Sequence, residues 1–398
     1  MVLIGTTLQL ASALLVYALG LLASARIGRR LGLNARRAAL LYVWHAMFCI
    51  AYAVYAVNNG ADALVYYAKA LNGEFMLSVG TGAVVSIATL FVTTLNLSFL
   101  GACLLFNVFG TIGLLALDAS LQDATRHARR LRRLATLIVL LPSISFWSSA
   151  LGKDSLAFMA TGLALWAALN LKRRSIVLAL AVGVMLLVRP HIAGIMVIAL
   201  TGSLVVQRRI PLGQRMLLGA AALAATAAMV PFAMNYAGVG EAAGTADLVE
   251  YMEQRQAVNT QGGSSVDIAS MSLPMQLYSY LFRPLPFEAA SIFALAASVD
   301  NLMLLCLFIA GARRMLTRRG RSLQGNRAFL WLYCLLTWII LAVTTANLGI
   351  AVRQKWMFAP MLLYLLVSLL VKTPRATRPG RVETGRARAL PAGAEGAP

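Results

Sequence analysis

Long apolar runs separated by short polar connectors dominate this chain of 398 residues. A helix that crosses the hydrocarbon core of a bilayer needs about 17 to 25 consecutive, mostly apolar residues. Runs near this length predict an all-α protein with about eleven membrane-spanning helices, and a range of ten to twelve because several runs are short. The predicted spans are 4–24, 38–57, 99–117, 134–150, 155–171, 175–189, 191–206, 216–236, 289–311, 328–346 and 357–371.

One further apolar stretch, Gly80 to Ser98, is left out of this count. Counting it as a span would move the basic cluster Arg126 to Arg133 to the other side of the membrane. Polar residues recur along one helical face of the stretch, namely Ser86, Thr89, Thr93 and Asn96. We therefore expect an amphipathic helix that lies in the outer interface, or a re-entrant segment.

The composition supports an integral membrane protein. Apolar residues make up 60% of the chain, charged residues make up 12%, and the mean hydropathy is +0.76. A net charge of +21 is also found in nucleic-acid-binding proteins, but here the cations occupy short connectors between apolar runs. We therefore expect contact with anionic membrane lipids and no nucleic-acid partner. The four cysteines fall inside predicted spans and predict no disulfide framework.

The distribution of Lys and Arg predicts the topology. Of the 35 basic residues, 28 fall on alternate connectors, and an excess of basic residues in short connectors marks the cytoplasmic side. The first run, Met1 to Ser24, has no basic segment before it, so we interpret it as a span and not as a cleaved signal peptide. The prediction is a multi-pass membrane protein with its N-terminus outside and its C-terminus in the cytoplasm.

These features divide the chain into a polytopic membrane domain, 1–372, and a basic tail, 373–398. The tail is rich in Arg, Pro, Gly and Ala, which predicts a disordered cytoplasmic segment. Two longer segments fall on the outer face, 58–98 and 238–288, and connectors of this length are often functional. The second is the larger outer loop.

Seven basic residues lie on the outer face, and five of them come from four separate hairpins. These five are predicted to converge as a substrate-binding set, Lys153, Arg189, Arg283, Arg353 and Lys355. Guanidinium groups suit a phosphate or pyrophosphate because they donate paired, charge-assisted hydrogen bonds. The alternative is that these cations bind the head groups of structural lipids.

An acid and a histidine on the same face are candidate proton acceptors. Asp62 stands four residues before Tyr66, so the two share a helical face in the first outer segment. Asp62 suits a general base, although an acid that begins a helix is also stabilised by the helix dipole. His191 follows Pro190 in an outer turn, where it is either a second base or an ordinary packed residue.

The hairpin Pro142 to Asp154 adds Trp147 and Asp154 to the candidate substrate-binding residues, together with Tyr66. Pro142 removes a helical hydrogen bond, which membrane proteins tolerate beside a cavity or a neighbouring helix. The simpler interpretation of the hairpin is an interfacial aromatic anchor followed by a helix cap. Asp300 lies within a predicted span, so we expect it to face the interior of the bundle. We find no phosphate-binding loop and no metal-ligand spacing, and we predict neither a metal site nor a cofactor.

Five segments together resemble a broad bacterial group of polytopic membrane proteins in exopolysaccharide and O-antigen synthesis. They are an outer Asp-x-x-x-Tyr at Asp62, a Pro-Ser-x-x-Phe-Trp-Ser-Ser-x-x-x-Lys-Asp hairpin at 142–154, an Arg-Pro turn at Arg189, a Phe-Arg-Pro-x-Pro-Phe-Glu segment at 282–288 and an Asn-x-Gly-x-x-x-Arg at 347–353. The group contains Wzy-like polymerases, which are related in outline to the GT-C membrane glycosyltransferases. The resemblance extends over about residues 40 to 365.

The resemblance implies an enzyme that transfers or polymerises sugars linked to polyprenyl (pyro)phosphate at the outer face of the inner membrane. Its partners would be the polyprenyl-linked glycan, membrane lipids and other polysaccharide-synthesis proteins. By resemblance, Arg189, Arg283 and Arg353 match the outer arginines of the polymerases, and Asp62 matches the acid of the GT-C first outer loop. Two alternatives remain open, a GT-C-type transferase that adds a single sugar, and a lipid-glycan transporter or non-catalytic subunit of a synthesis complex.

Overall fold

The computed structural model describes residues 2–206, 213, 216, 220, 224, 227, 266–268, 270–289, 291–317 and 326–371, and the fold is stated for these residues. Within them the regular structure is helical throughout, and no strand is present. Most of the predicted run 216–236, the larger part of the predicted outer loop 238–288, and the tail 373–398 lie outside the described residues.

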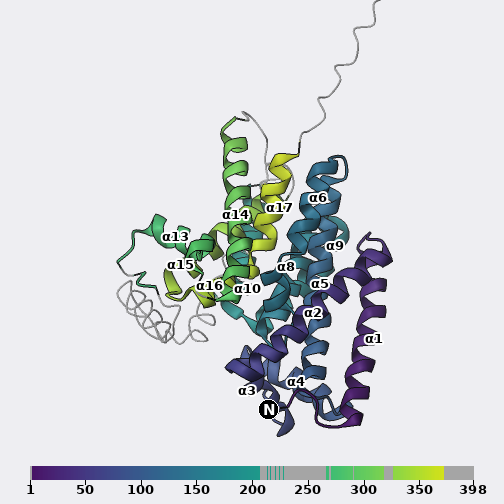
Figure 1. Cartoon of the computed structure of the whole chain (residues 1–398). Helices are drawn as coiled ribbons and strands as arrows, with labels where there is room; N and C mark the ends of the chain where they lie inside the picture. Colours follow the sequence, from purple (N-terminus) through teal and green to yellow (C-terminus); the bar gives the residue numbers. More distant parts are fainter. Residues whose placement is uncertain are drawn as a thin grey trace, which may run out of the picture.

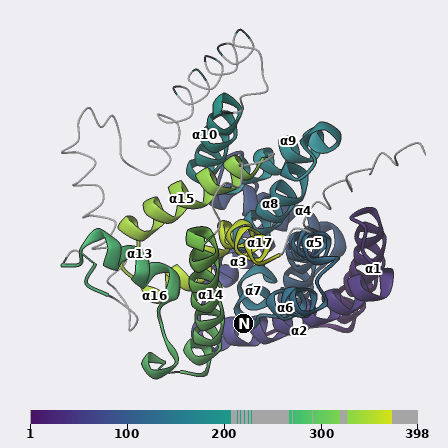
Figure 2. The same ribbon diagram turned by 90° about the horizontal axis from the view of Figure 1, so that it is seen from above.

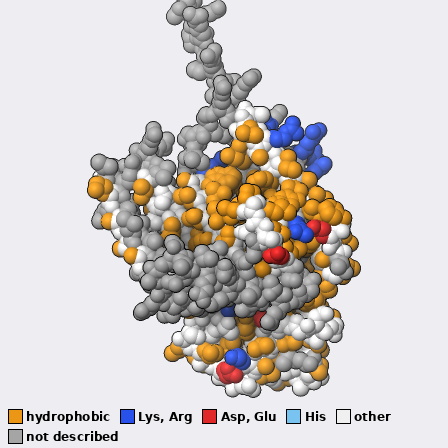
Figure 3. All heavy atoms as spheres, turned by 90° about the vertical axis from the view of Figure 1, so that its left-hand side faces the viewer, with side chains coloured by type: hydrophobic (Ala, Val, Ile, Leu, Met, Phe, Trp, Pro, Cys, Tyr) orange, Lys and Arg blue, Asp and Glu red, His pale blue; other side chains and the backbone are white. Residues whose placement is uncertain are grey.

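Three long helices form one side of the bundle, α1 (Thr7–Arg30), α2 (Ala35–Asn59) and α5 (Phe99–Thr125) (Figure 1). Each begins at a polar residue whose side chain accepts a hydrogen bond from a backbone N–H of the first turn. These caps are Thr6, Asn34 and Ser98. The basic residues of the α1–α2 and α5–α6 connectors gather at one end of the bundle, which we name the basic end. Figure 3 shows Lys and Arg side chains there, above a broad apolar band.

A buried ion pair fixes these helices at the basic end. The guanidinium of Arg37 on α2 donates two hydrogen bonds to Asp118 on α5, from Nε at 2.6 Å and from Nη2 at 2.8 Å. The same Nη2 donates to Thr136 on α6 (Arg129–Val139) at 3.0 Å. Asp118 is fully buried, so its charge is stable only because this partner neutralises it.

The stretch left out of the span count is helical. α4 (Thr81–Leu95) packs against α3 (Asp62–Leu71) at the end opposite the basic end (Figure 1). Its polar face has a protein partner, because Ser86 bonds both backbone groups of Met76 at 2.9 Å and Thr89 donates to the carbonyl of Glu74 at 2.6 Å. Ser86 and Thr89 thus pack on a loop, whereas Thr93 and Asn96 of the same stretch are exposed. Placement of this helix in the outer interface, or as a re-entrant segment, stays a prediction.

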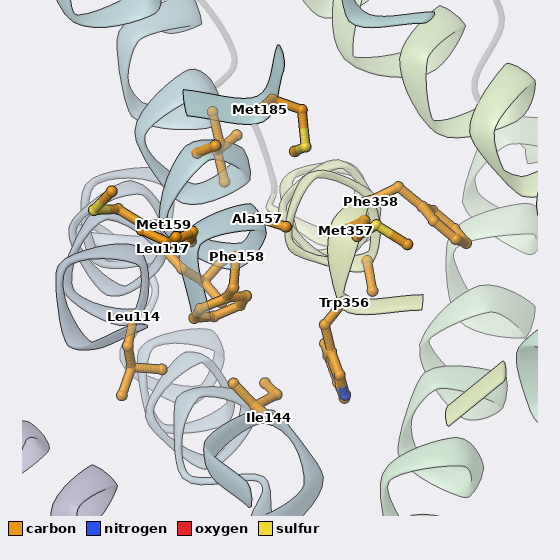
Figure 4. Packing of buried hydrophobic residues seen from close by; sticks show 14 of the residues in the cluster. Leu114, Leu117, Ile144, Ala157, Phe158, Met159, Met185, Trp356, Met357 and Phe358 are labelled. Carbon is orange, nitrogen blue, oxygen red and sulfur yellow. The ribbon is translucent and has the colours of Figure 1, made fainter. Parts of the chain in front are cut away.

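Helix α8 (Lys153–Ala168) passes through the middle of the bundle, between α5 and α9 (Leu171–Val188), and α17 (Ala359–Leu370) is also central when the bundle is seen from above (Figure 2). A Cβ atom at Gly162 of α8 would lie only 2.4 Å from the carbonyl oxygen of Gly113 on α5. Small residues thus allow the two backbones to approach closely. Phe158 and Met159 of α8 pack among side chains of α5, α7 and residues 356–358 (Figure 4).

Two helices are interrupted. α6 and α7 (Pro142–Ser148) meet at a bend of 40°, as the predicted loss of a hydrogen bond at Pro142 requires. α16 (Leu348–Gln354) continues as a 3₁₀ turn, η2 (Lys355–Met357), and bends by 68° into α17. The remaining elements are α10 (Pro190–Val206), α13 (Leu273–Phe282), the 3₁₀ turn η1 (Pro286–Glu288), α14 (Ile292–Thr317) and α15 (Arg327–Thr344).

Among the described residues, five helices are long and apolar enough to cross a membrane, and seven spans result if each bent pair counts as one. This identifies an α-helical membrane protein, but the predicted count of eleven is not confirmed. Every predicted run except 216–236 overlaps a helix or a bent pair. The count differs because α8 has 16 residues, α10 has 17, α9 carries three basic residues in its first turn, and most of the predicted run 216–236 lies outside the described residues.

Candidate functional site

Asp154 lies at the centre of a group of charged side chains from separate helices. It is the second residue of α8, and only 11% of its side chain is exposed. Its Oδ1 accepts a hydrogen bond from Nη2 of Arg189 at 2.7 Å, and its Oδ2 accepts one from Nε of Arg353. One buried carboxylate thus holds two guanidinium groups side by side.

Asp62 contacts the same arginine from the other side. Its Oδ2 lies 3.3 Å from Nη1 of Arg353, while 59% of its side chain is exposed. We name these residues the ion cluster, Asp62, Lys153, Asp154, Arg189 and Arg353. Three cations and two carboxylates leave one positive charge in the cluster.

Local sequence explains where these side chains lie. Gly60 ends α2 with a φ of 76°, which is accessible to glycine, and the sharp turn places Asp62 in the first turn of α3. Arg189 separates α9 from α10 in a non-helical conformation, as expected before Pro190. Asn347 caps α16 by accepting from the N–H of Ile350 at 3.2 Å, so Arg353 falls in the last turn of that helix.

The cluster perturbs the titration of its members. Burial raises the pKa of Asp154, but Arg353 and Arg189 more than offset burial and hold that pKa below its ordinary value of 3.8. Burial, together with the charge of Arg189, lowers the pKa of Lys153 below 10.5, although Asp154 opposes the change. Asp154 therefore stays ionised and keeps both arginines in place.

Tyr66 lies one helical turn after Asp62, as the spacing predicts, and its ring is buried. Burial and the charge of Asp62 raise the pKa of the Tyr66 phenol, so the group remains a neutral hydrogen-bond donor. Trp147 of α7 packs edge-on against Tyr52 of α2, with ring centroids 6.1 Å apart. Trp147 also borders a small cleft beside Asp154 and Arg353.

An apolar groove of about 600 Å³ adjoins the ion cluster. Its walls come from α2, α7 and α14, with Phe48, Ala51 and Tyr55 on the first of these helices. The ring centroids of Tyr55 and Phe293 lie 4.7 Å apart, and both residues line the groove. Trp147 borders both the groove and the small cleft, whereas none of the five residues of the ion cluster lines the groove itself.

Arg283 lies at the groove and not in the ion cluster. Its Nε donates to Oε1 of Glu288 at 2.8 Å, and Oε2 of the same glutamate accepts from the N–H of Leu285, also at 2.8 Å. This local loop includes Pro284 and Pro286, and it presents a paired charge to an apolar surface. Arg283 therefore contacts the candidate site as one half of an ion pair.

Lys355 also lies apart from the ion cluster. Its side chain is buried, and its Nζ donates to Oδ1 of Asn301 on α14. Of the five cations that were expected to converge, Lys153, Arg189 and Arg353 do so, whereas Arg283 and Lys355 have other partners. His191 is half-buried at the start of α10.

Sequence reasoning overlooked a polar group directly behind the cluster. His45 of α2 is fully buried, with Nδ1 2.6 Å from Oδ1 of Asn107 and Nε2 3.0 Å from Oγ of Ser148. Ser148 borders the cleft that contains Asp154 and Arg353. An ionisable residue in the middle of an apolar run was the available signal, because such a residue needs polar partners.

The arrangement offers hydrogen-bond donors to an anion and a carboxylate to a neighbouring hydroxyl. Nε of Arg189 is buried and has no hydrogen-bond partner in the described part of the chain. In that same part, no group of three His, Cys, Asp or Glu side chains is arranged to hold a metal ion.

Comparisons with protein families, with curated proteins and with solved structures find no match to this chain.

Proposed function

We propose that this protein transfers or polymerises sugars linked to polyprenyl (pyro)phosphate at the outer face of the bacterial inner membrane, in exopolysaccharide or O-antigen synthesis. The observation that carries the proposal is the placement of Arg189 and Arg353 on one buried carboxylate, beside the exposed Asp62 and an apolar groove. Such a site combines binding for an anion, a hydroxyl and a hydrocarbon chain.

The positive charge of the ion cluster suits the phosphate of a lipid-linked sugar. Asp154 neutralises part of the charge of the two arginines and orients them, while their remaining N–H groups can donate to phosphate oxygens. Fixed donors of this kind stabilise negative charge that develops on a leaving group. In this proposal the cations therefore act on the bond between the sugar and the phosphate.

The transfer step follows from these roles. The acceptor hydroxyl loses its proton to the carboxylate of Asp62, and its oxygen forms a bond to the anomeric carbon of the donor sugar. The bond between that carbon and the phosphate oxygen breaks, and the lipid (pyro)phosphate leaves beside Arg189 and Arg353. The apolar groove next to Trp147 suits the first part of the lipid chain, because most of its lining is apolar.

A transporter of lipid-linked glycans is the second candidate, and the two bent helix pairs favour it. Bends of 40° and 68° interrupt α6–α7 and α16–α17, and interrupted helices commonly line transport pathways. A transporter needs cations that bind the lipid phosphate but no base. It would therefore tolerate Asp62→Asn, which a transferase would not.

The test is a glycan profile, by gel electrophoresis and mass spectrometry, of a deletion strain complemented with wild type or Arg353→Ala at equal membrane abundance. We expect Arg353→Ala to accumulate single lipid-linked repeat units and to lose long chains. Arg126→Ala is the matched control, because Arg126 is an exposed arginine at the basic end with a partner 3.8 Å away.

The outcomes separate the candidate functions. Long chains at the wild-type level in the Arg353→Ala strain would contradict the proposed role of the ion cluster. One sugar missing from every unit, with chain length unchanged, would identify a transferase that adds a single sugar. An unchanged glycan in the deletion strain itself would reject the whole proposal.

A further inference from the structure

Two adjacent residues in the middle of α14, Asp300 and Asn301, are buried and polar. A polar pair inside an apolar helix carries an energetic cost unless each group has a partner. The partners of this pair lie on three segments that are far apart in the sequence. Each of those segments carries a residue of the candidate site.

Asn301 joins two of these segments. Its Nδ2 donates to the carbonyl oxygen of Pro284 at 2.9 Å, directly after Arg283. Its Oδ1 accepts from Nζ of Lys355, two residues after Arg353. One fully buried amide therefore connects the loop at the groove with the helix that supplies an arginine to the ion cluster.

Asp300 joins the third segment. Its Oδ2 accepts from the backbone N–H of Ser143 at 2.9 Å, in the first turn of α7. That helix carries Trp147, which borders both the groove and the cleft at the ion cluster. A shift of α7 relative to α14 would therefore change the shape of the groove.

General helix packing would also account for a buried polar pair, but it would not account for the choice of partners. All three hydrogen bonds of the pair end within five residues of Trp147, Arg283 or Arg353. None of these bonds joins α14 to the long helices α1 and α5. The pair thus bonds the segments around the site.

We infer that Asp300 and Asn301 are positioning residues, which hold the segments 142–148, 283–288 and 353–357 in register around the substrate. The part of this inference that concerns catalysis rests on the proposed function. The part that concerns geometry does not, because the three contacts are measurable without any substrate.

Hydrogen exchange with mass spectrometry, on the full-length protein in lipid nanodiscs, tests the geometry. In Asn301→Leu the amides of 283–288 and 353–357 should exchange about fivefold faster than in wild type, as expected for the loss of one hydrogen bond. Amides of α1 and α5 should not change. Equal acceleration throughout the bundle, or no change in the two segments, would overturn the inference.

Two further variants separate the contacts. Asn301→Asp keeps an acceptor for Lys355 but loses the donor to Pro284, so only 283–288 should exchange faster. Lys355→Met should accelerate exchange only in 353–357. Asp118→Asn is the matched control, because it alters a buried acid near the basic end and should leave both segments unchanged.

The same variants are then tested for the glycan product. We expect Asn301→Leu to lower product yield about tenfold at equal abundance, with a smaller loss in Asn301→Asp, which keeps one of the two contacts. Local acceleration of exchange together with full product yield would overturn the positioning role. If wild type itself forms no glycan product, the proposed function fails, and the exchange results still decide whether the pair holds the three segments.

Discussion

Arg353 and Asp154 are 199 positions apart in the sequence, yet Nε of Arg353 donates a hydrogen bond to Oδ2 of Asp154. The bond joins α16 to the start of α8. It also sets the direction of the guanidinium, whose Nη1 then reaches Asp62. The geometry of the candidate site therefore depends on the planar shape of the Arg353 guanidinium as well as on its charge.

Arg353→Lys should retain the charge but not the function. An ammonium group is a single point charge and cannot hold Asp154 and Asp62 in two directions at once. We expect the yield of long glycan to fall about tenfold, measured by gel profile at equal protein abundance. Arg173→Lys, at an exposed position of the basic end, should have no effect. A wild-type profile from Arg353→Lys would show that charge alone suffices.

The pairing of Asp154 should make stability depend on pH in the acidic range. Because its pKa in the folded protein lies below the ordinary value of 3.8, the pair contributes fully well above pH 3.8 and its contribution is lost as the pH falls below it. We expect the melting temperature of the purified protein to drop more steeply below about pH 4 in wild type than in Asp154→Asn. Parallel curves for the two proteins would contradict this assignment.

Asp62→Asn should abolish transfer and preserve binding. The amide cannot accept the proton of the acceptor hydroxyl, and loss of a general base lowers rates by about 10² to 10⁴. We expect the variant to bind lipid-linked repeat units, detectable by mass spectrometry of the purified protein, and to form no polymer. Asp123→Asn, an exposed acid near the basic end, serves as control. Polymer formation by Asp62→Asn at the wild-type rate would favour the transporter.

Filling the groove should weaken binding of the lipid chain. Ala51 lines the groove, and its neighbour Ile50 on α2 is exposed without lining it. Ala51→Phe adds a ring to the groove, so we expect about tenfold weaker retention of the lipid-linked substrate, whereas Ile50→Phe should bind as wild type does. Equal retention in the two variants would show that the lipid chain lies elsewhere.

The ion pair at the basic end should matter for stability and not for the reaction. Asp118→Ala leaves Arg37 partly buried without its partner, and breaking such a pair costs about 3 to 5 kcal/mol. We expect a lower melting temperature and reduced abundance, but normal product per folded molecule. A specific loss of product at normal stability would assign this end a functional role.

The sequence predicted the elements better than their contacts. Every predicted apolar run except 216–236 overlaps a helix or a bent helix pair, and Pro142 predicted the break between α6 and α7. The contact between Asp62 and Arg353 could not be predicted, because it joins residues 291 positions apart. Such a contact depends on how the helices pack, which periodicity does not specify.

Two departures from the expected convergence of the cations have local causes. Residues two apart on a helix point away from each other, so Arg353 and Lys355 were poor candidates for a single shared phosphate site. Arg283 stands five residues before Glu288 in a segment bent by two prolines, which favours a local ion pair. The importance of Asn301 was less accessible, since its two partners come from different segments.

The dimensions of α9 have a consequence for the surrounding bilayer. Its apolar part, residues 175–188, measures about 21 Å at 1.5 Å per residue, whereas the hydrocarbon core of a bilayer is about 30 Å thick. Ile176 and Leu180 are exposed on this helix, and basic residues bound the stretch at both ends. In the proposed function, α9 would cross a bilayer that is thicker than its apolar part, and this hydrophobic mismatch would draw the lipid head groups inward beside it. A lipid phosphate in that leaflet would then lie at the depth of Arg189 and would reach the ion cluster by lateral diffusion, without leaving the membrane.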